Sequence, residues 1–283
     1  MAINYDKLMS LKTQGQEFEY GERETMLYAL GIGFGRDPMN TKELPFVYEK
    51  NLVAMPTLAT VVAWGAGNMR ESGINYLMVV HGEQKLTLHR PMPVAARISV
   101  DTRTIGAWDK GEGKGAIVVT ETVISEKGGD KICTLESTTF ARGDGGFGGP
   151  REGAPVPHAL PTRAPDQTVE LDTRPDQALL YRLSGDRNPL HADPEIAALA
   201  GFPRPILHGL CTYGTCARAL ATTVADHDPS RITGFDVRFS SPVFPGETIL
   251  VDIWKDGGIA SFRARVKERD VVVINNGKCT LKG

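Results

Sequence analysis

The stretch LCTYGTCARALATTVA, residues 210–225, has the apolar spacing of an α-helix and carries a single charged side chain, Arg218. A helix with so little charge is expected to be buried on most of its sides. Further along the chain the apolar period changes to two: in SFRARVK, residues 261–267, apolar and basic side chains alternate, as in a half-buried strand. The sequence therefore predicts an α+β fold, in which an antiparallel sheet wraps around one buried helix.

Further strands are predicted around SFRARVK. ETILVDIWK (247–255) precedes it and DVVVINNGKCTLK (270–282) follows it. KDGG and NNG are turn signals, and we expect them to join these strands. Similar strand patterns occur earlier in the chain, in ARISVDTRTI, GAIVVTETVIS and KICTLESTTFA, at residues 96–105, 115–125 and 131–141.

An internal repeat with an offset of about 152 residues relates the two parts of the chain. Three segments recur in the same order. YALGIG (28–33) parallels YRLSGD (181–186), MPTLATVVAWG (55–65) parallels LHGLCTYGTCA (207–217), and KLTLHRPMPVAARISV (85–100) parallels DVRFSSPVFPGETILV (236–251). We interpret this as two copies of one fold, whose sheets would pair edge to edge.

A segment rich in glycine and proline separates the two copies, as a linker does. The predicted domains are an N-terminal copy at residues 1–145, a linker at 146–166 and a C-terminal copy at 167–283.

The composition bounds the class of function. Hydrophobic residues make up 41% of the chain, charged residues 23%, and the net charge is −2. The sequence has no apolar run long enough for a membrane helix and no basic run, which argues against a membrane or nucleic acid as partner and favours a small substrate in the cytoplasm. Four cysteines without metal-binding spacing are expected to be small buried side chains, with no disulfide or zinc site: Cys133, Cys211, Cys216 and Cys279.

The stretch LSGDRNPLHAD, residues 183–193, concentrates side chains suited to proton transfer. Asn188 precedes a proline that excludes a helical path, so the side chains of Asp186 and His191 can converge from a turn. A carboxylate and an imidazole that hold one water between them can perform general acid and base catalysis, with Asn188 orienting the pair or the substrate. The alternative is a purely structural turn, in which these polar side chains cap backbone amides. A calcium loop is disfavoured because its sixth position would be histidine.

The start of the predicted buried helix is a second candidate feature. His208 and Gly209 lie where unpaired amides and the helix dipole favour negative charge. An amide there can bind the oxygen of a carbonyl as it becomes an enolate, although a glycine at a helix start is often only structural. The first copy has Gly33 in place of Asp186, Pro56-Thr57 in place of His208-Gly209, and no histidine in the equivalent run GFGRDPMN (33–40), which favours a function confined to the second copy.

The run from Tyr181 to Gly214, together with RFSSPVFPGETI (238–249), resembles the signature of the MaoC-like dehydratases and, within them, the hydratase 2 enzymes, which are (R)-specific 2-enoyl-CoA hydratases. The resemblance covers nearly the whole chain and implies a double hot-dog fold, with two antiparallel sheets each wrapped around a central helix. It also implies that the first copy is non-catalytic and that its altered helix region makes room for a bulky acyl group.

The resemblance assigns roles to individual residues. Asp186 and His191 match the catalytic pair, Asn188 the assisting polar residue, and Gly209 the amide that binds the thioester oxygen. His208, Arg238 and Tyr181 are expected to contact the substrate. Arg238, Arg204 and Arg187 are candidates for binding the phosphates of coenzyme A because they lie near the motifs, and an exposed arginine without this role is the alternative for each.

The activity implied by the resemblance is reversible hydration of trans-2-enoyl-CoA to (R)-3-hydroxyacyl-CoA, as in fatty acid β-oxidation. No metal or cofactor is expected, since coenzyme A is part of the substrate, and a homodimer is the expected assembly. Two alternatives stay open. A hot-dog thioesterase normally carries a carboxylate on its central helix, which residues 210–225 lack, and a non-catalytic acyl-CoA-binding subunit would not need the Asp186 cluster. The length and type of the acyl group are not predicted.

Overall fold

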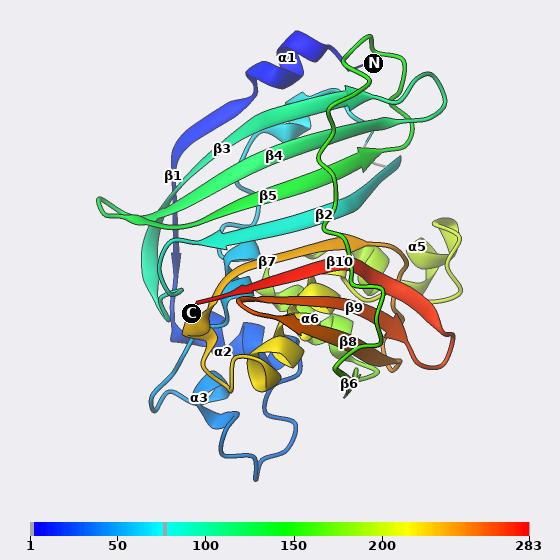
Figure 1. Ribbon diagram of the computed structural model, residues 1–283. Coiled ribbons are helices and arrows are strands. Elements are labelled where there is room, and N and C mark those ends of the chain that lie inside the picture. Colours follow the sequence, from blue (N-terminus) through cyan, green and yellow to red (C-terminus); the bar gives the residue numbers. More distant parts are fainter. Residues whose placement is uncertain (1–2, 76–77, 283) are drawn as a thin grey trace.

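The computed structural model describes residues 3–75 and 78–282 (Figure 1). In this part of the chain ten strands form one continuous antiparallel sheet, in the order β1-β3-β4-β5-β2-β7-β10-β9-β8-β6. The strands of the first half are β1 (Lys12–Tyr20), β2 (Val79–Leu88), β3 (Ala96–Asp109), β4 (Ala116–Glu126) and β5 (Lys131–Ala141). Those of the second half are β6 (Gln167–Asp172), β7 (Ile232–Phe239), β8 (Thr248–Asp256), β9 (Ile259–Val266) and β10 (Val271–Leu281).

The strand order confirms the repeat. The second half has the same order as the first, read from the other edge, and the two halves meet where β2 pairs with β7. In this antiparallel pair Glu83 lies opposite Arg238, and Gln84 opposite Val237. The predicted edge-to-edge pairing of the two copies is therefore confirmed.

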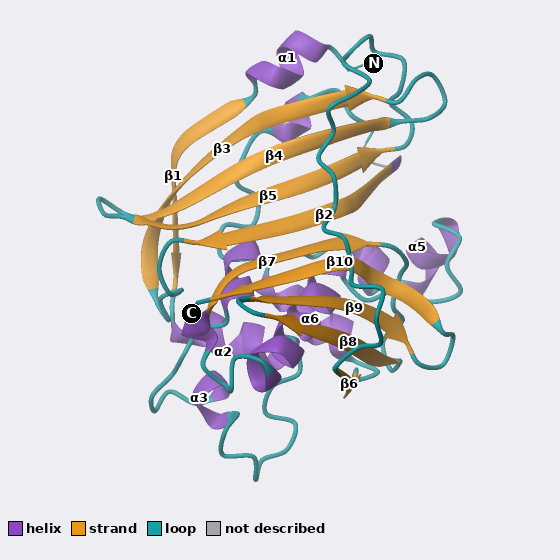
Figure 2. Ribbon diagram, viewed as in Figure 1, coloured by secondary structure: helices purple, strands orange, loops and turns teal. Residues whose placement is uncertain are grey.

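The helices gather on one side of the sheet (Figure 2). The α-helices are α1 (Tyr5–Ser10), α2 (Glu22–Gly31), α3 (Leu44–Val47), α4 (Gln177–Tyr181), α5 (Pro194–Leu199) and α6 (Gly209–Thr223). Short 3₁₀ helices are η1 (Pro56–Thr60), η2 (Met69–Glu71), η4 (Arg182–Ser184), η5 (Pro189–His191) and η6 (Pro229–Arg231). Within the described residues, no helix combines the length and the apolar character needed to cross a bilayer.

Helix α6 is the central helix that the sequence predicted. It is buried along most of its length and packs against the sheet of the second half. Gly214 allows α2 to approach closely, because a Cβ atom there would lie 2.4 Å from Ile32 Cγ2 and 2.7 Å from the Tyr28 hydroxyl. The α+β class and the double hot-dog fold are confirmed. The expectation of two separate sheets, each with a central helix, is wrong: the two halves share one sheet, and among the described residues only the second half has a central helix.

The first half has no helix equivalent to α6 among its described residues. Where the repeat places one, the chain forms η1 and then a series of turns up to residue 65. Gly65 and Gly67 both have a φ of 89°, a conformation that ends a right-handed helix. The expected altered helix region is thus a short 3₁₀ turn followed by irregular backbone.

One of the two predicted hairpin turns is wrong. KDGG joins β8 to β9 as expected, but NNG lies inside β10 as a bulge, where the register shifts between Asn275 and Lys278. Asn276 has a φ of 54°, and an Asn-Gly pair suits a bulge with positive φ as well as a two-residue turn. Residues 267–270 make the β9–β10 turn instead.

The segment between β5 and β6 crosses the outer face of the sheet, away from the helices (Figure 2). The Trp254 indole donates to the Arg163 carbonyl at 2.8 Å, and the Asn276 amide donates to the His158 carbonyl at 2.8 Å. Side chains of β8 and β10 thus hold this segment on the sheet. The four cysteines are buried and free, as predicted.

A buried ion pair links the central helix to the first half. Arg218 on α6 donates to Glu43 at 2.9 Å, and the two side chains are 12% and 7% exposed. The other Glu43 oxygen accepts the Gly35 amide, and the guanidinium lies 5.3 Å from the centre of the Phe34 ring. Removing one partner of such a pair leaves a buried charge without compensation.

We therefore expect Glu43→Gln to lower the free energy of unfolding by about 3 kcal/mol, because Arg218 would stay buried with its charge unpaired. The measurement is urea unfolding followed by circular dichroism. Glu19→Gln is the matched control: its pair with Arg97 is 67% and 72% exposed, so the loss should stay below about 1 kcal/mol. Equal losses in the two variants would show that burial of the Glu43 pair has no special weight.

Candidate active site

The 3₁₀ helices η4 and η5 and the start of α6 position the side chains of residues 186–209. The chain leaves η4 at Gly185, and η5 then begins at Pro189 after a turn in which Asn188 Oδ1 accepts the Leu190 amide at 3.0 Å. Asp186 Oδ1 accepts the Asn188 amide, also at 3.0 Å. The hydrogen bonds expected of a purely structural turn, in which polar side chains cap backbone amides, are therefore present. They also fix the turn that holds Asp186 and His191 close together.

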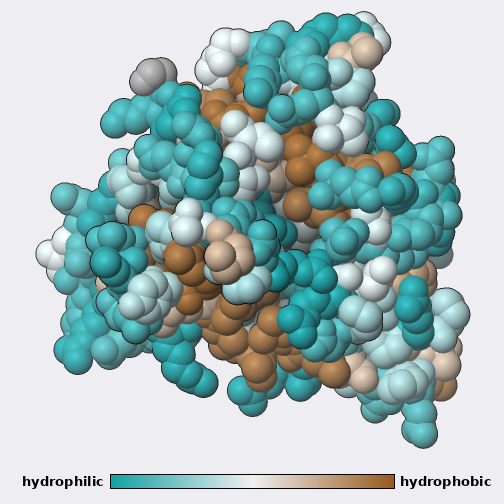
Figure 3. Space-filling view, turned by 90° about the horizontal axis from the view of Figure 1, so that it is seen from below, coloured by the Kyte–Doolittle hydropathy of each residue, from teal (hydrophilic) through white to brown (hydrophobic). Residues whose placement is uncertain are grey.

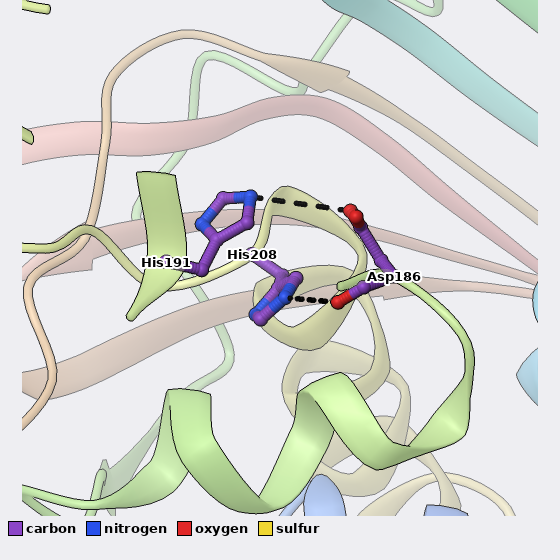
Figure 4. Close-up of side chains that lie close together, drawn as sticks. All are labelled: Asp186, His191 and His208. Carbon is purple, nitrogen blue, oxygen red and sulfur yellow. Dashed lines mark hydrogen bonds and ion pairs between the residues drawn. The ribbon is translucent and has the colours of Figure 1, made fainter. Parts of the chain in front are cut away.

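The Asp186 carboxylate and the His191 imidazole point toward each other (Figure 4). His191 Nε2 lies 3.9 Å from Asp186 Oδ2, too far for a direct hydrogen bond and close enough for one bridging water to contact both atoms. His191 Nδ1 contacts the Ile206 carbonyl at 2.9 Å. Because a carbonyl only accepts, Nδ1 carries the proton and Nε2 presents its lone pair toward Asp186.

His208 holds the backbone of Asp186 in place. Its Nε2 donates to the Asp186 carbonyl at 3.0 Å. Its ring stacks on His191 with the ring centres 3.8 Å apart, and Tyr181 packs against it with the centres 5.1 Å apart. His208 is 1% exposed, so it supports the pair from within the core.

Burial keeps both imidazoles neutral. It lowers the pKa of His191 below its usual 6.5, against the opposing effects of the Ile206 carbonyl and the Asp186 charge. Burial and the neighbouring His191 lower the pKa of His208 to about 3. At neutral pH His191 thus offers a neutral imidazole with a free lone pair beside Asp186, and such an imidazole can accept a proton from water.

Gly209 is the first residue of α6, so its amide has no partner within the helix. The positive end of the helix dipole lies at the same point. The Phe239 ring covers the Cα of Gly209, and a Cβ atom there would lie 3.4 Å from Phe239 Cε1. An acceptor oxygen placed beside Gly209 would accept a hydrogen bond from its amide, and the positive end of the helix dipole would stabilise negative charge on that oxygen.

Sequence reasoning missed His81, which comes from the first half of the chain. The β2–β7 pairing brings its ring onto Phe239, with ring centres 4.7 Å apart and a tilt of 45°. Its Nε2 is buried without a hydrogen-bond partner among the described residues, and burial lowers its pKa to about 4. Only the alignment of the two copies in space reveals this residue, because its neighbours in sequence carry no motif.

The other predicted site residues, Arg238, Tyr181 and Asn188, have different positions relative to the cluster. Arg238 is exposed and, by strand alternation, faces away from Phe239. It lines a hollow of about 200 Å³ on the outer face of the sheet, beneath residues 156–158. Tyr181 is 1% exposed and lies behind His208. Asn188 is exposed and uses its oxygen to cap η5. Substrate contacts of these three residues stay predictions.

The cluster of Asp186, His191 and His208 brings three potential metal ligands within 4.8 Å of one another. The two imidazole rings, however, are stacked with only 27° between their planes. Ring lone pairs lie in the ring plane, so the two histidines direct theirs along nearly parallel planes and not toward a common point. This geometry suits proton transfer better than ion binding.

A small cavity of about 100 Å³ is lined by both halves of the chain, and neither Asp186 nor His191 is among its lining residues. Leu58, Val61 and Val62 come from the altered helix region, and Leu183 and Ser184 from η4. Seen from below, apolar residues also gather near the centre of the helical face (Figure 3). Exposed apolar side chains on helical segments include Leu30, Leu44, Leu179 and Leu183.

Comparison with known proteins gives two family matches. Residues 18–143 match the MFE-2 hydratase 2 N-terminal domain, and residues 157–277 match the MaoC like domain. The peroxisomal enoyl-CoA hydratase 2 of Arabidopsis thaliana is 39% identical over 96% of this chain and 94% of its own length. The 3-hydroxyacyl-thioester dehydratase Y of Mycobacterium tuberculosis is 42% identical over 95% of this chain and 94% of its own length.

Solved structures agree with the fold. A MaoC-like dehydratase from Phytophthora capsici superposes with a TM-score of 0.88 at 35% identity, covering 99% of both chains. The full-length peroxisomal multifunctional enzyme type 2 from Drosophila melanogaster gives a TM-score of 0.83 at 38% identity, covering 96% of this chain and 48% of that one.

The buried cluster predicts how His191 titrates. Because burial holds its pKa below 6.5, its NMR signals should report a neutral ring at pH 7 and protonation only at lower pH. Asp186→Asn should lower the pKa of His191 further, since the carboxylate charge that favours the imidazolium is removed. Asp193→Asn removes an exposed carboxylate that caps α5 and should leave the His191 titration unchanged. A pKa of His191 at or above 6.5 would contradict the buried geometry.

Proposed function

The chain belongs to the MaoC-like dehydratase family in its two-domain hydratase 2 form, and we propose that it reversibly hydrates trans-2-enoyl-CoA to (R)-3-hydroxyacyl-CoA. The observation that carries the proposal is the Asp186–His191 pair, held 3.9 Å apart beside the start of α6. Hydration of a 2-enoyl thioester requires three things: a group that deprotonates water, a donor to the thioester oxygen and a proton for C2. We propose that Asp186 and His191 supply the first and the third, and that the Gly209 amide supplies the second.

In the proposed mechanism, one water lies between Asp186 Oδ2 and His191 Nε2. The pair takes a proton from this water as its oxygen bonds to C3. The π electrons of the C2–C3 bond move toward the thioester carbonyl, which becomes an enolate. The enolate then collapses, and C2 takes a proton back from the pair. One oxygen–hydrogen bond of water is broken and one C–O and one C–H bond are formed, so the substrate gains H and OH.

The enolate oxygen is proposed to bind the Gly209 amide. Charge develops on this oxygen only during the reaction, so a donor aimed at it favours the transition state over the bound substrate. Because this donor belongs to a helix start, it needs no rearrangement. His208 is not proposed to touch the reacting atoms. It positions the pair, since it donates to the Asp186 carbonyl and stacks on His191.

The substrate is proposed to run along the junction of the two halves. Phe239 lies beside Gly209, and its ring contacts His81 of the first half. The buried His81 Nε2 is suited to bind a polar group of the thioester arm. Arg238 can serve the phosphates of coenzyme A only if the nucleotide reaches the outer face of the sheet. The acyl group would extend toward the cavity at Leu58 and Val61.

Among the alternatives, a thioesterase is not favoured. Residues 209–223 of α6 contain no Asp or Glu, so the carboxylate that such an enzyme normally carries on this helix is missing. A non-catalytic acyl-CoA-binding subunit would have no use for a neutral imidazole poised against a carboxylate. The hydratase accounts for both features.

We also propose that the enzyme acts as a cytoplasmic homodimer that needs no metal or cofactor. Four buried thiols without a disulfide suit a reducing compartment. Some relatives carry the word peroxisomal in their names, so localisation of a tagged chain decides between the two compartments. Light scattering on the purified protein tests the dimer, and assays with and without a chelator test the need for metal.

The first test of function is loss of the conjugated thioester absorbance of trans-2-enoyl-CoA, with chiral analysis of the product. We expect (R)-3-hydroxyacyl-CoA. Asp186→Asn and His191→Ala should each lower kcat about 100-fold or more, because either change removes one half of the proton-transfer pair. Asp193→Asn, which keeps the cap of α5, is the control and should retain activity. Free coenzyme A as the product would favour a thioesterase instead.

A further inference from the structure

The altered helix region of the first half contacts the turn that leads into Asp186 in the second half. The contact is made by Trp64 against Gly185. Trp64 lies in the turns that follow η1 and is 44% exposed. A Cβ atom built on Gly185 would lie 2.8 Å from Trp64 Cβ, 2.9 Å from Cγ and 3.4 Å from Cδ2. The side chain of Trp64 therefore occupies the space beside Gly185, the residue directly before Asp186.

Gly185 has an unusual backbone conformation, with φ 138° and ψ −46°. L-residues with side chains rarely adopt such a φ, and a glycine that adopts it is free to move unless its neighbours restrain it. On one side, the Gly185 amide donates to the Arg182 carbonyl at 3.3 Å. On the other side Trp64 closes the space.

Hydrogen bonds hold the backbone around Trp64 in place. The Trp64 amide donates to the Val61 carbonyl at 3.2 Å. Three residues later, the Gly67 amide donates to the Gln16 side chain of β1 at 2.8 Å, which fixes the segment to the edge strand of the sheet. Leu183 and Ser184 also face Leu58, Val61 and Val62 across the small cavity, so the contact between this region and η4 extends beyond one residue.

We propose that Trp64 is a positioning residue for Asp186. By filling the space beside Gly185, it sets the path of the backbone into Asp186. That path fixes the Asp186 carbonyl against His208 and the Asp186 carboxylate against His191. The first copy, which lacks the catalytic residues, thereby contributes to catalysis through the segment that replaced its central helix.

The reason for an effect on rate is geometric. A misplacement of about 1 Å of a reacting group costs on the order of 10- to 100-fold in rate, and the Asp186–His191 separation of 3.9 Å allows a bridging water only within a narrow range. Trp64→Ala removes the ring that restrains Gly185 and should let Asp186 drift from this position. Trp64→Phe keeps equivalents of Cβ, Cγ and Cδ2, the three atoms nearest Gly185, and should preserve it.

The test rests on the proposed hydratase activity and compares a short with a long trans-2-enoyl-CoA. We expect Trp64→Ala to lower kcat about 10-fold or more for both substrates, with KM within about twofold, and Trp64→Phe to restore most of the rate. Tyr48→Ala is the matched control, because Tyr48 is an aromatic residue of the first half with the same 44% exposure. A rise in KM confined to the long substrate would overturn the proposal and make Trp64 an acyl contact. An unchanged rate would also overturn it.

An NMR titration of His191 provides a second readout that does not depend on turnover. The Asp186 charge raises the pKa of His191, so displacement of Asp186 in Trp64→Ala should lower that pKa, while Trp64→Phe and Tyr48→Ala leave it unchanged. If the wild-type protein hydrates no enoyl-CoA, the proposed function fails, but this titration still decides whether Trp64 positions Asp186. An unchanged His191 pKa in Trp64→Ala would refute the proposal.

Discussion

The pairing of β2 with β7 is the interaction on which the rest of this structure depends. It joins two five-stranded halves into one sheet and sets the register in which the two copies of the fold face each other. Through it, His81 of the first copy reaches Phe239 of the second, beside the start of α6. The buried Arg218–Glu43 pair and the contact of Trp64 with Gly185 cross the same boundary. The candidate site is therefore a property of the joined sheet.

The two copies of the fold differ in structure around the candidate site. The second copy kept a long buried helix whose first amide is free, and a turn that sets a carboxylate against an imidazole. Among its described residues, the first copy has only a 3₁₀ turn and irregular backbone where that helix would lie, and we propose that the acyl group of the substrate uses this region. Burial lowers the pKa of both histidines of the cluster, which favours their neutral form.

Much of this could be predicted from the sequence. Periodicity located α6 and the main strands, and the repeat predicted the joined sheet. A short motif predicts structure less well when it is compatible with two local structures. The Asn-Gly pair at residues 276–277 forms a bulge and not the predicted hairpin turn. The cluster at Asp186 and His191 followed from residue types close in sequence. His81 and Trp64 could not be found that way, because their contacts arise only when strands and turns distant in sequence are brought together.

In the proposed mechanism, one pair of groups on one face of the substrate both activates the water and returns a proton to C2. Hydration of a trans-2-enoyl-CoA in deuterium oxide tests this most directly, with the configuration at C2 and C3 of the product determined by NMR. We expect a single deuterium at C2, on the same face as the new C3 hydroxyl. A deuterium on the opposite face, or a mixture of both configurations at C2, would contradict it, since the proton would then come from elsewhere.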